Sequence, residues 1–412
     1  MVEQVTVGVD IGCRRHRVAI AAPDGRIAEE FDMEHGKEGF EKFFGRLSHY
    51  RESYQVPVVV AMEGFNGYAR PLDQQVREKG YCLLNVNNLK LCRFKEIFPG
   101  AAKTDRIDAR KIVELVRLHP VLSREKEILQ EVREVPEGHQ VLKRLTRRRR
   151  QLVQEKVCVL NRMQADLQGV SPGLADIVEY KDGLAFLRFL TCRPRLEQLG
   201  KIQERELLQI PGVGKAFAEK VRKWQRTSFF SQEVGFVGPM IQEDARRILE
   251  LREQIEGLEK EIRRLSEESR LGQLVGSIPG FGVVCTGEIV GEIGTMERFP
   301  TERSLALYLG MAPLDNSSGN YRGTKVTKQV NRRGRAAMMA AVAHHARSVE
   351  ESRHYYEKKR EEGKTHNQAV RALGRHMVRV IWSMVKRNEP YRVVRMDESL
   401  NRELAGSRDL KI

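Results

Sequence analysis

The sequence predicts a mixed α/β region at the amino-terminal end, followed by long helices and a mainly helical carboxyl-terminal region. Three observations support this fold class. Short runs rich in β-branched residues alternate with helical patterns in the first quarter of the chain, long polar segments then carry apolar residues at spacings of three and four, and helical spacing returns after residue 330. At 412 residues, the chain is long enough for two or three domains.

The amino-terminal elements come in an informative order. The expected elements are strands at 4–10, 16–22 and 27–32 with a Pro-Asp-Gly turn at 23–25, a helix with Phe40, Phe43, Phe44 and Leu47 inward, a strand at 56–63, a helix at 69–79, a strand at 81–86, and a helix from Leu89. Three antiparallel strands followed by alternating helices and strands is the order of a ribonuclease-H-like mixed sheet.

Four carboxylates stand at the ends of these elements. Asp10 and Glu63 each end an apolar strand, and Asp105 and Asp108 share one face at the start of a helix. Ligand sites in α/β sheets gather at strand ends, and four hard oxygen ligands suit Mg²⁺ or Mn²⁺. The alternative is that Thr104 caps the helix and the two aspartates complement its dipole.

Composition favours a polyanionic partner. The chain has 72 Lys plus Arg against 56 Asp plus Glu, a formal charge of +16, which most simply indicates nucleic acid. No apolar run approaches the ~18 residues of a membrane span, and Glu3 stands where a signal peptide would be basic, so a cytoplasmic protein is expected. The six cysteines form no C-x-x-C pair and are expected to be reduced core residues.

Two long helices are expected in the middle of the chain. The first covers 138–167 and contains the run Arg147, Arg148, Arg149 and Arg150, which either follows a phosphate backbone or forms a solvated basic face. The second covers 241–265 and has a heptad-like apolar seam. This seam can pack on the first helix or on a second protomer.

A short motif occurs twice. Residues 208–214 read Leu-Gln-Ile-Pro-Gly-Val-Gly and residues 276–282 read Gly-Ser-Ile-Pro-Gly-Phe-Gly, both like the hairpin of a helix-hairpin-helix motif. The glycine pairs Gly212 and Gly214, and Gly280 and Gly282, would let backbone N–H groups approach a phosphate. The alternative is an ordinary Pro-Gly turn between helices.

A serine loop with many cations follows residue 315. Ser317, Ser318 and Gly319 precede six basic residues, namely Arg322, Lys325, Lys328, Arg332, Arg333 and Arg335. A hydroxyl among such cations can attack a phosphodiester whose charge they offset, although a Ser-Gly pair is usually plain loop chemistry. His344 and His345, on a helix at 336–346, are expected to be packing or surface residues. A helix at 367–386 is expected to pack in the core, and the charged tail after Tyr391 is expected to be loose.

Taken in order, these motifs resemble the transposases of the IS110 type over residues 5 to 390. The resemblance rests on Gly-Val-Asp at 8–10, Met-Glu-Gly at 62–64, Lys-Thr-Asp-Arg-Ile-Asp-Ala at 103–109, Ile-Pro-Gly at 278–280, Leu-Gly at 309–310, Ser-Gly at 318–319 and Thr-Lys-Gln at 327–329. Residues 330–335 depart from it, since they read Val-Asn-Arg-Arg-Gly-Arg where the family often has Gly-Asn-Arg-x-Leu-Arg. Residues 7–12 also resemble the first phosphate loop of actin-like and sugar-kinase ATPases, but the second loop of those proteins is missing.

The IS110 resemblance implies a domain order and a chemistry. It implies a RuvC-like domain at 1–125 with the tetrad Asp10, Glu63, Asp105 and Asp108, long helices or a coiled coil at 126–270, a transposase domain at 271–390 and a tail at 391–412. It further implies that Ser318, or its neighbour Ser317, attacks DNA to give a covalent phosphoserine link while the tetrad holds Mg²⁺.

The resemblance also implies partners. These are element and target DNA, a structured guide RNA encoded by the element, and at least one further copy of the chain, in a dimer or tetramer. The expected nucleic-acid contacts are Lys103, Arg106, Arg147, Arg148, Arg149, Arg150, Gly212, Gly214, Gly280, Gly282, Arg322, Lys325, Lys328, Arg332 and Arg333. Two other functions remain open, a RuvC-like junction nuclease that activates water and a non-catalytic nucleic-acid-binding protein.

Overall fold

A computed structural model describes residues 3–64, 67–97, 105–122, 129–315, 318–319, 323–326 and 330–392. For residues 105, 106, 121, 122, 314, 315 and 324–326 the backbone alone is described. The chain divides into two compact units, Met1–Glu134 and Val135–Ile412.

The first unit is built on a six-stranded mixed sheet. Its strands are β1 (Val5–Asp10), β2 (Arg15–Ala21), β3 (Ile27–Glu34), β4 (Val58–Glu63), β5 (Cys82–Val86) and β6 (Leu129–Glu131). They lie in the order β3-β2-β1-β4-β5-β6. The first three pair antiparallel, β1, β4 and β5 run parallel, and β6 closes the edge antiparallel to β5. The predicted meander and the alternation that follows it are confirmed.

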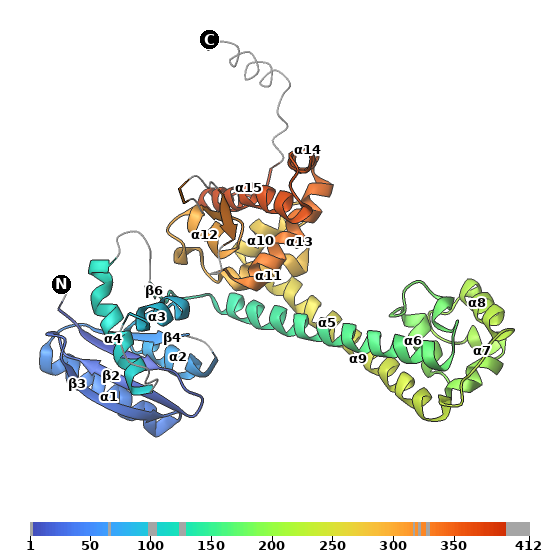
Figure 1. Ribbon diagram of the computed structural model, residues 1–412, viewed down its shortest axis with the longest axis horizontal. Helices are drawn as coiled ribbons and strands as arrows, with labels where there is room; N and C mark the ends of the chain where they lie inside the picture. Colours follow the sequence, from blue (N-terminus) through green and yellow to red (C-terminus); the bar gives the residue numbers. More distant parts are fainter. Residues whose placement is uncertain are drawn as a thin grey trace, which may run out of the picture. The chain divides into compact units, whose positions relative to one another are not determined.

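Helices cover both faces of this sheet (Figure 1). They are α1 (Lys37–Tyr54), the 3-10 turn η1 (Gly67–Ala69), α2 (Arg70–Glu78), α3 (Asn88–Lys95) and α4 (Asp105–Leu122). Alternate residues of each strand face opposite sides. The side chains of Val7, Val9 and Met62 therefore join the core under α1 and α2. On the other face, Ala61 joins the core formed with α3 and α4.

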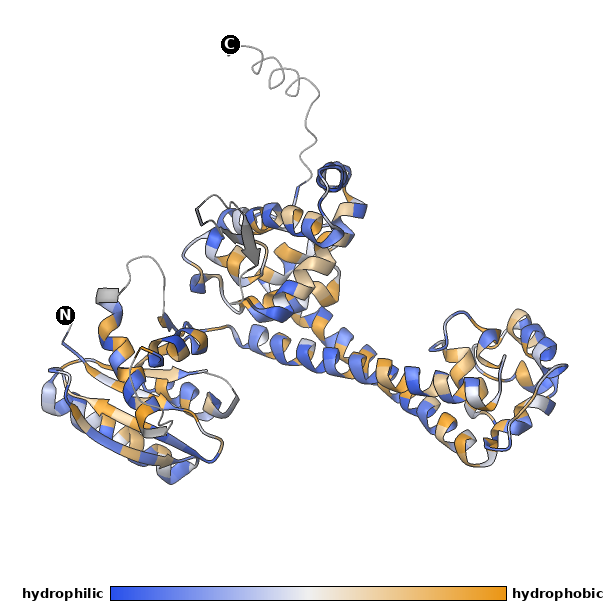
Figure 2. Ribbon diagram, viewed as in Figure 1, coloured by the Kyte–Doolittle hydropathy of each residue, from blue (hydrophilic) through white to orange (hydrophobic). Residues whose placement is uncertain are grey.

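The second unit is organised along two long helices, α5 (Glu137–Val170) and α9 (Val234–Glu268), which pack against each other. Leu152, Leu251 and Ile255 form the apolar contact along the pair. Their exposed faces are hydrophilic (Figure 2). The heptad-like seam of α9 therefore packs on α5 of the same chain, the first of the two partners that the sequence allowed.

Two helical clusters flank this pair. One contains η2 (Ala175–Ile177), α6 (Leu184–Thr191), η3 (Leu196–Lys201), α7 (Glu204–Leu207) and α8 (Lys215–Gln225). The other contains α10 (Arg270–Gly276), α11 (Val283–Ile293), η4 (Met296–Arg298), α12 (Glu302–Tyr308), β7 (Pro313–Asp315), β8 (Thr324–Val326), α13 (Arg332–Ser348), α14 (Glu350–Glu361) and α15 (His366–Arg387). We call the second one the carboxyl-terminal bundle.

Some details differ from the sequence-based expectations. The hairpin β7–β8, strand β6 and helix α14 were not expected. Helix α9 begins at Val234, seven residues before the expected start at residue 241, and includes Pro239 in its second turn. The prediction that the cysteines are core residues is wrong. All six thiols are free, but four are exposed and the other two only half-buried. None of the described helices is long and apolar enough to cross a membrane.

Candidate active site

Asp10 and Glu63 lie side by side at one end of the sheet. Strands β1 and β4 are parallel neighbours in which Val9 pairs with Met62, so the next residue of each strand is the carboxylate. Neighbouring strands lie about 4.8 Å apart. Asp10 follows Gly8 on one face and Glu63 follows Ala61 on the same face, since side chains alternate along a strand. Both carboxylates are half-buried.

The direction of α4 brings its first turn to the same end of the sheet. A Cβ added at Gly8 would lie 2.4 Å from the carbonyl oxygen of Ala109, so α4 crosses β1 at very close range. Further along α4, Arg117 donates to the carbonyls of Asp24 and Gly25 at 3.1 and 3.0 Å. That turn lies beside the start of β1, because Thr6 pairs with the last residue of β2. Helix α4 therefore runs opposite to β1 and begins near the carboxylates.

Asp105 and Asp108 both lie in this first turn of α4. Asp108 is buried, at 9% exposure, and its Oδ1 lies 2.8 Å from the Nζ of Lys95, the last residue of α3. The side chain of Asp105 is outside the described part. Among the described residues, no three His, Cys, Asp or Glu side chains form a set that could hold a metal ion. Lys95 was not predicted, since its contact with Asp108 depends on how α3 and α4 pack.

A histidine pair supports the loop after Asp10. His16 is completely buried, accepts a hydrogen bond from the Gly12 N–H through Nδ1 at 3.3 Å, and has its Nε2 2.9 Å from Nδ1 of His35. Burial, helped by the neighbouring His35, lowers the pKa of His16 to about 4. His16 is therefore neutral at pH 7 and acts as an internal support for the loop.

The serine loop belongs to the second unit. Ser318 is exposed and Gly319 has a φ of +56°, while Ser317, Arg322, Lys328 and Lys103 lie outside the described residues. For Arg106 and Lys325 the backbone is described, in α4 and β8. Arg332 and Arg333 are exposed in the first turn of α13. The described cations are thus at the surface next to the loop, and their role stays a prediction.

Three of the four arginines at 147–150 make ion pairs within the chain. Arg147 binds Glu292 through two hydrogen bonds of 2.7 and 2.9 Å, and Arg150 binds Glu288 at 3.1 and 2.5 Å. Arg149 donates to Glu259 of α9 at 2.7 Å. These three side chains therefore do not form a purely solvated face, and their contact with a phosphate backbone stays a prediction. Arg148 alone of the four is exposed.

The two glutamates bound by Arg147 and Arg150 are buried, with 1% exposure for Glu292 and 5% for Glu288. Burial raises the pKa of Glu288 despite the neighbouring guanidinium. Burial opposes ionisation of Glu292 too, but hydrogen bonds from Arg147 and Asn331 outweigh it and lower its pKa. These pairs join α5 to α11, which accounts for much of the arginine run in structural terms.

The two Pro-Gly hairpins have the same backbone but different surroundings. Gly212 and Gly280 have φ values of +87° and +85°, and Gly214 and Gly282 are the N-caps of α8 and α11. Gly212 and Gly214 are exposed. A Cβ at Gly280 would lie 2.4 Å from the backbone nitrogen of His345, so the back of the second hairpin is packed on α13. The first hairpin is therefore the more accessible one.

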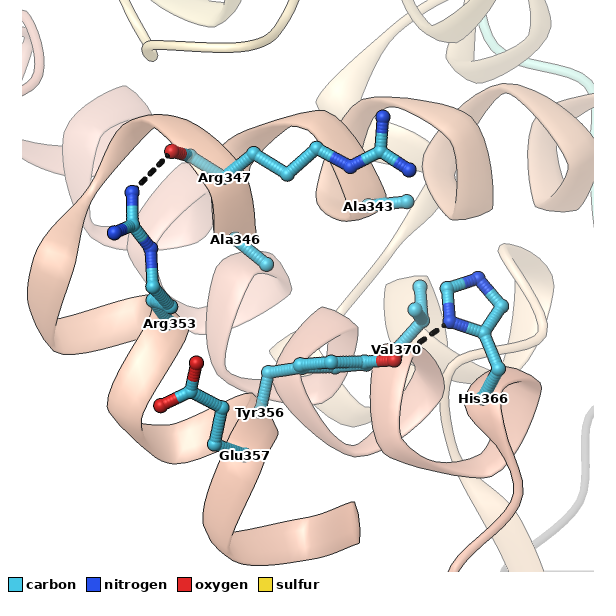
Figure 3. A pocket seen from close by; sticks show the side chains of 8 residues that line it. All are labelled: Ala343, Ala346, Arg347, Arg353, Tyr356, Glu357, His366 and Val370. Atoms are coloured by element: carbon cyan, nitrogen blue, oxygen red, sulfur yellow. Dashed lines mark hydrogen bonds between the residues drawn. The ribbon is translucent and has the colours of Figure 1, made fainter.

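A surface cavity of about 340 Å³ lies between α13, α14 and α15 (Figure 3). Tyr356 forms one wall, with its hydroxyl 2.8 Å from Nδ1 of His366, and Arg353 donates to the carbonyl of Arg347 at 2.7 Å. None of the predicted site residues lines this cavity.

The chain matches two transposase families in sequence. Residues 7–172 match the IS110-type DEDD family, described as "Transposase", and residues 272–357 match the "Transposase IS116/IS110/IS902 family". These ranges contain the four carboxylates and the serine loop respectively.

Similar proteins come from insertion elements. The IS116 uncharacterized 44.8 kDa protein of Streptomyces clavuligerus is 28% identical over 301 residues, or 71% of this chain and 74% of the relative. The IS110 uncharacterized 43.6 kDa protein of Streptomyces coelicolor is 24% identical over 93% of this chain and 94% of the relative. The IS1111A transposase of Coxiella burnetii is 26% identical over 34% and 40%. With its mixed sheet, its DEDD match and these relatives, the chain belongs to the IS110 family of DNA transposases.

Proposed function

We propose that this transposase cuts and rejoins DNA through attack by Ser318, assisted by a divalent ion held by Asp10, Glu63, Asp105 and Asp108. The observation that carries the proposal is the convergence of β1, β4 and the first turn of α4 at one end of the sheet. Caps and dipole partners would explain the two aspartates of α4, but they would not explain why two strands end on carboxylates at the same place.

The residue types at this end of the sheet suit a hard cation, although the described side chains do not form a ligand set as they stand, so a bound ion would have to draw the carboxylates together. Four carboxylates from two strand ends and one helix turn provide oxygen ligands of the kind that Mg²⁺ or Mn²⁺ prefers. The ammonium of Lys95 already lies against Asp108, so this carboxylate has positive charge as its neighbour. A bound divalent ion would offset charge on the scissile phosphate. Lys95 would then have to give up its contact with Asp108.

Ser318 supplies the nucleophile in this proposal. Its Oγ forms a bond to phosphorus, the phosphodiester bond to the leaving strand breaks, and that strand leaves as a free hydroxyl after taking up a proton. Attack by another strand's hydroxyl on the phosphoserine reverses the step and joins new ends. Ser318 is exposed, which leaves its hydroxyl open to a DNA strand.

The partners follow from the same proposal. The net charge of +16 favours nucleic acid, and we propose element DNA, target DNA and an element-encoded guide RNA as its ligands. The carboxylates and Ser318 belong to different units of the chain, so a composite site from two or more copies fits this division.

A denaturing gel tests the proposal directly. Purified protein is incubated with Mg²⁺, labelled element DNA and RNA transcribed from the sequence beside the gene. We expect a covalent protein–DNA adduct that Ser318→Ala loses and Ser317→Ala keeps. Asp108→Asn should lose both the adduct and joining.

Each alternative predicts a different gel. A nuclease that activates water would cut DNA without an adduct, and Ser318→Ala would still cut. An adduct retained by Ser318→Ala but lost by Ser317→Ala would assign the nucleophile to the neighbouring serine. Absence of any cutting by the wild-type protein with its own element DNA and RNA would contradict the proposed chemistry.

A further inference from the structure

Both ends of the segment that contains Ser318 are tied to the same helix turn. At its start, the N–H of Met311 donates to the carbonyl of Ala306 at 2.8 Å. At its end, the N–H of Asn331 donates to the carbonyl of Tyr308, also at 2.8 Å. The described residues on either side of Ser318 are therefore held at the last turn of α12, through Met311 before them and Asn331 after them.

The side chain of Asn331 uses all of its hydrogen-bonding capacity at this point. Its Oδ1 accepts from the N–H groups of Arg333 and Gly334 at 3.0 and 2.9 Å and so caps α13. Its Nδ2 donates to Oε2 of Glu292 and to the hydroxyl of Tyr308, both at 2.7 Å. A primary amide has two N–H donors and one oxygen that can accept two hydrogen bonds, so every donor and acceptor site of this side chain is used.

Glu292 is a rigid anchor for this amide. It is 1% exposed, and Arg147 of α5 holds its carboxylate through two hydrogen bonds. Helix α11, which carries Glu292, packs so closely on α5 that a Cβ at Gly291 would lie 2.6 Å from the backbone nitrogen of Lys143. The hydroxyl of Tyr308 donates to the backbone carbonyl of Glu292 at 2.7 Å and so adds a second link.

We propose that Asn331 is a positioning residue that fixes the end of the Ser318 segment against the buried Glu292, an inference that rests on the proposed function. The amide joins three elements, α11, α12 and α13, at the point where the segment rejoins the bundle. This amide combines a helix cap with two donations into the bundle, so a change of one functional group can separate the two roles. Misplacement of a reacting group by about 1 Å can cost about 100-fold in rate.

The aspartate variant separates helix capping from positioning. Asn331→Asp keeps an oxygen that can cap α13, since aspartate is as good an N-cap as asparagine. It replaces the donating amide with a carboxylate that repels Glu292. We expect recombination between plasmids carrying the element ends and the flanking target to fall by about 100-fold, with DNA binding unchanged.

An exchanged pair provides the rescue. In Asn331→Asp/Glu292→Gln, the new amide nitrogen takes the place of Oε2 and donates to the new carboxylate at 331, while the remaining oxygen can still accept from Nε of Arg147. The second bond from Arg147 to Oε2 is lost, so recovery should be partial, at least tenfold over Asn331→Asp. Tyr308→Phe, which leaves the cap intact, should lower recombination by about tenfold. Thr301→Ala is the matched control, because it removes an exposed N-cap of α12 that does not touch the segment, and it should recombine within about twofold of wild type.

The outcomes are separable from those of the proposed function. The positioning role is overturned if Asn331→Asp recombines as well as the wild type. It is also overturned if the lower recombination of Asn331→Asp is not relieved by the exchanged pair. If Asn331→Asp proves unstable, normal recombination by Tyr308→Phe overturns it instead. Retained joining by Ser318→Ala would contradict the serine nucleophile, whatever the Asn331 variants do.

Discussion

Gly8→Ala tests whether the close approach of α4 to the sheet positions the carboxylates. The new Cβ would lie 2.4 Å from the carbonyl oxygen of Ala109, about 1 Å closer than the 3.4 Å at which ordinary contact begins, and 2.9 Å from a methyl group of Val113. The carbonyl oxygen of Ala109 is a backbone atom, so α4 itself has to move away from β1 by about 1 Å. Such overpacking costs about 1–3 kcal/mol of the free energy of unfolding.

The same movement shifts Asp108 relative to Asp10, so we expect joining to fall by about 100-fold. The assays are urea denaturation of the full chain and plasmid recombination with the element ends. Gly45→Ala is the matched control in the same unit, since its Cβ would meet nothing within 4 Å on the exposed side of α1. It should raise stability by about 0.5–1 kcal/mol and leave joining unchanged. Wild-type stability and joining in Gly8→Ala would refute the reasoning.

Three further predictions concern ion pairs, pH and metal. Arg147→Ala leaves the buried Glu292 without its guanidinium and should cost about 3 kcal/mol in urea denaturation, whereas the exposed Arg148→Ala should change stability by no more than about 0.5 kcal/mol. The pKa of His16 is lowered from 6.5 to about 4 in the folded chain, so as pH falls the unfolded chain takes up this proton before the folded chain does. The free energy of unfolding should therefore fall by about 2 kcal/mol between pH 7 and 5, and His16→Gln should abolish this fall in urea denaturation. Removal of divalent ions with a chelator should abolish joining, and added Mg²⁺ should restore it; joining that continues in excess chelator would exclude the metal-assisted route.

The sheet was predictable from the sequence because its order is set by local patterns. β-Branched runs ending at Asp10 and Glu63 mark the central strands, and Pro-Asp-Gly marks the hairpin turn after β2. Strand β6 was missed because Leu129 is its only apolar residue, and three residues at a sheet edge carry too little pattern to stand out.

The candidate site was predictable only in part. Strand-end carboxylates can be found locally, but the pairing of Lys95 with Asp108 arises from the packing of two helices. Likewise, Arg147 meets a glutamate 145 residues later in the chain, so a run of arginines looks like a free basic surface until the fold is known. Asn331 shows the same limit, since its contact with Glu292 depends on tertiary structure.

The paired helices α5 and α9 set a fixed spacing inside the second unit. With 34 residues at 1.5 Å each, α5 is about 51 Å long, and the cluster with the accessible Pro-Gly hairpin and the carboxyl-terminal bundle pack on different stretches of the pair (Figure 1). At 3.4 Å per step, that length corresponds to about 15 base pairs of duplex. Inserting or deleting one heptad in both helices would change the length of the pair by about 10 Å, or three base pairs. Such variants would alter the distance between the two clusters in known steps.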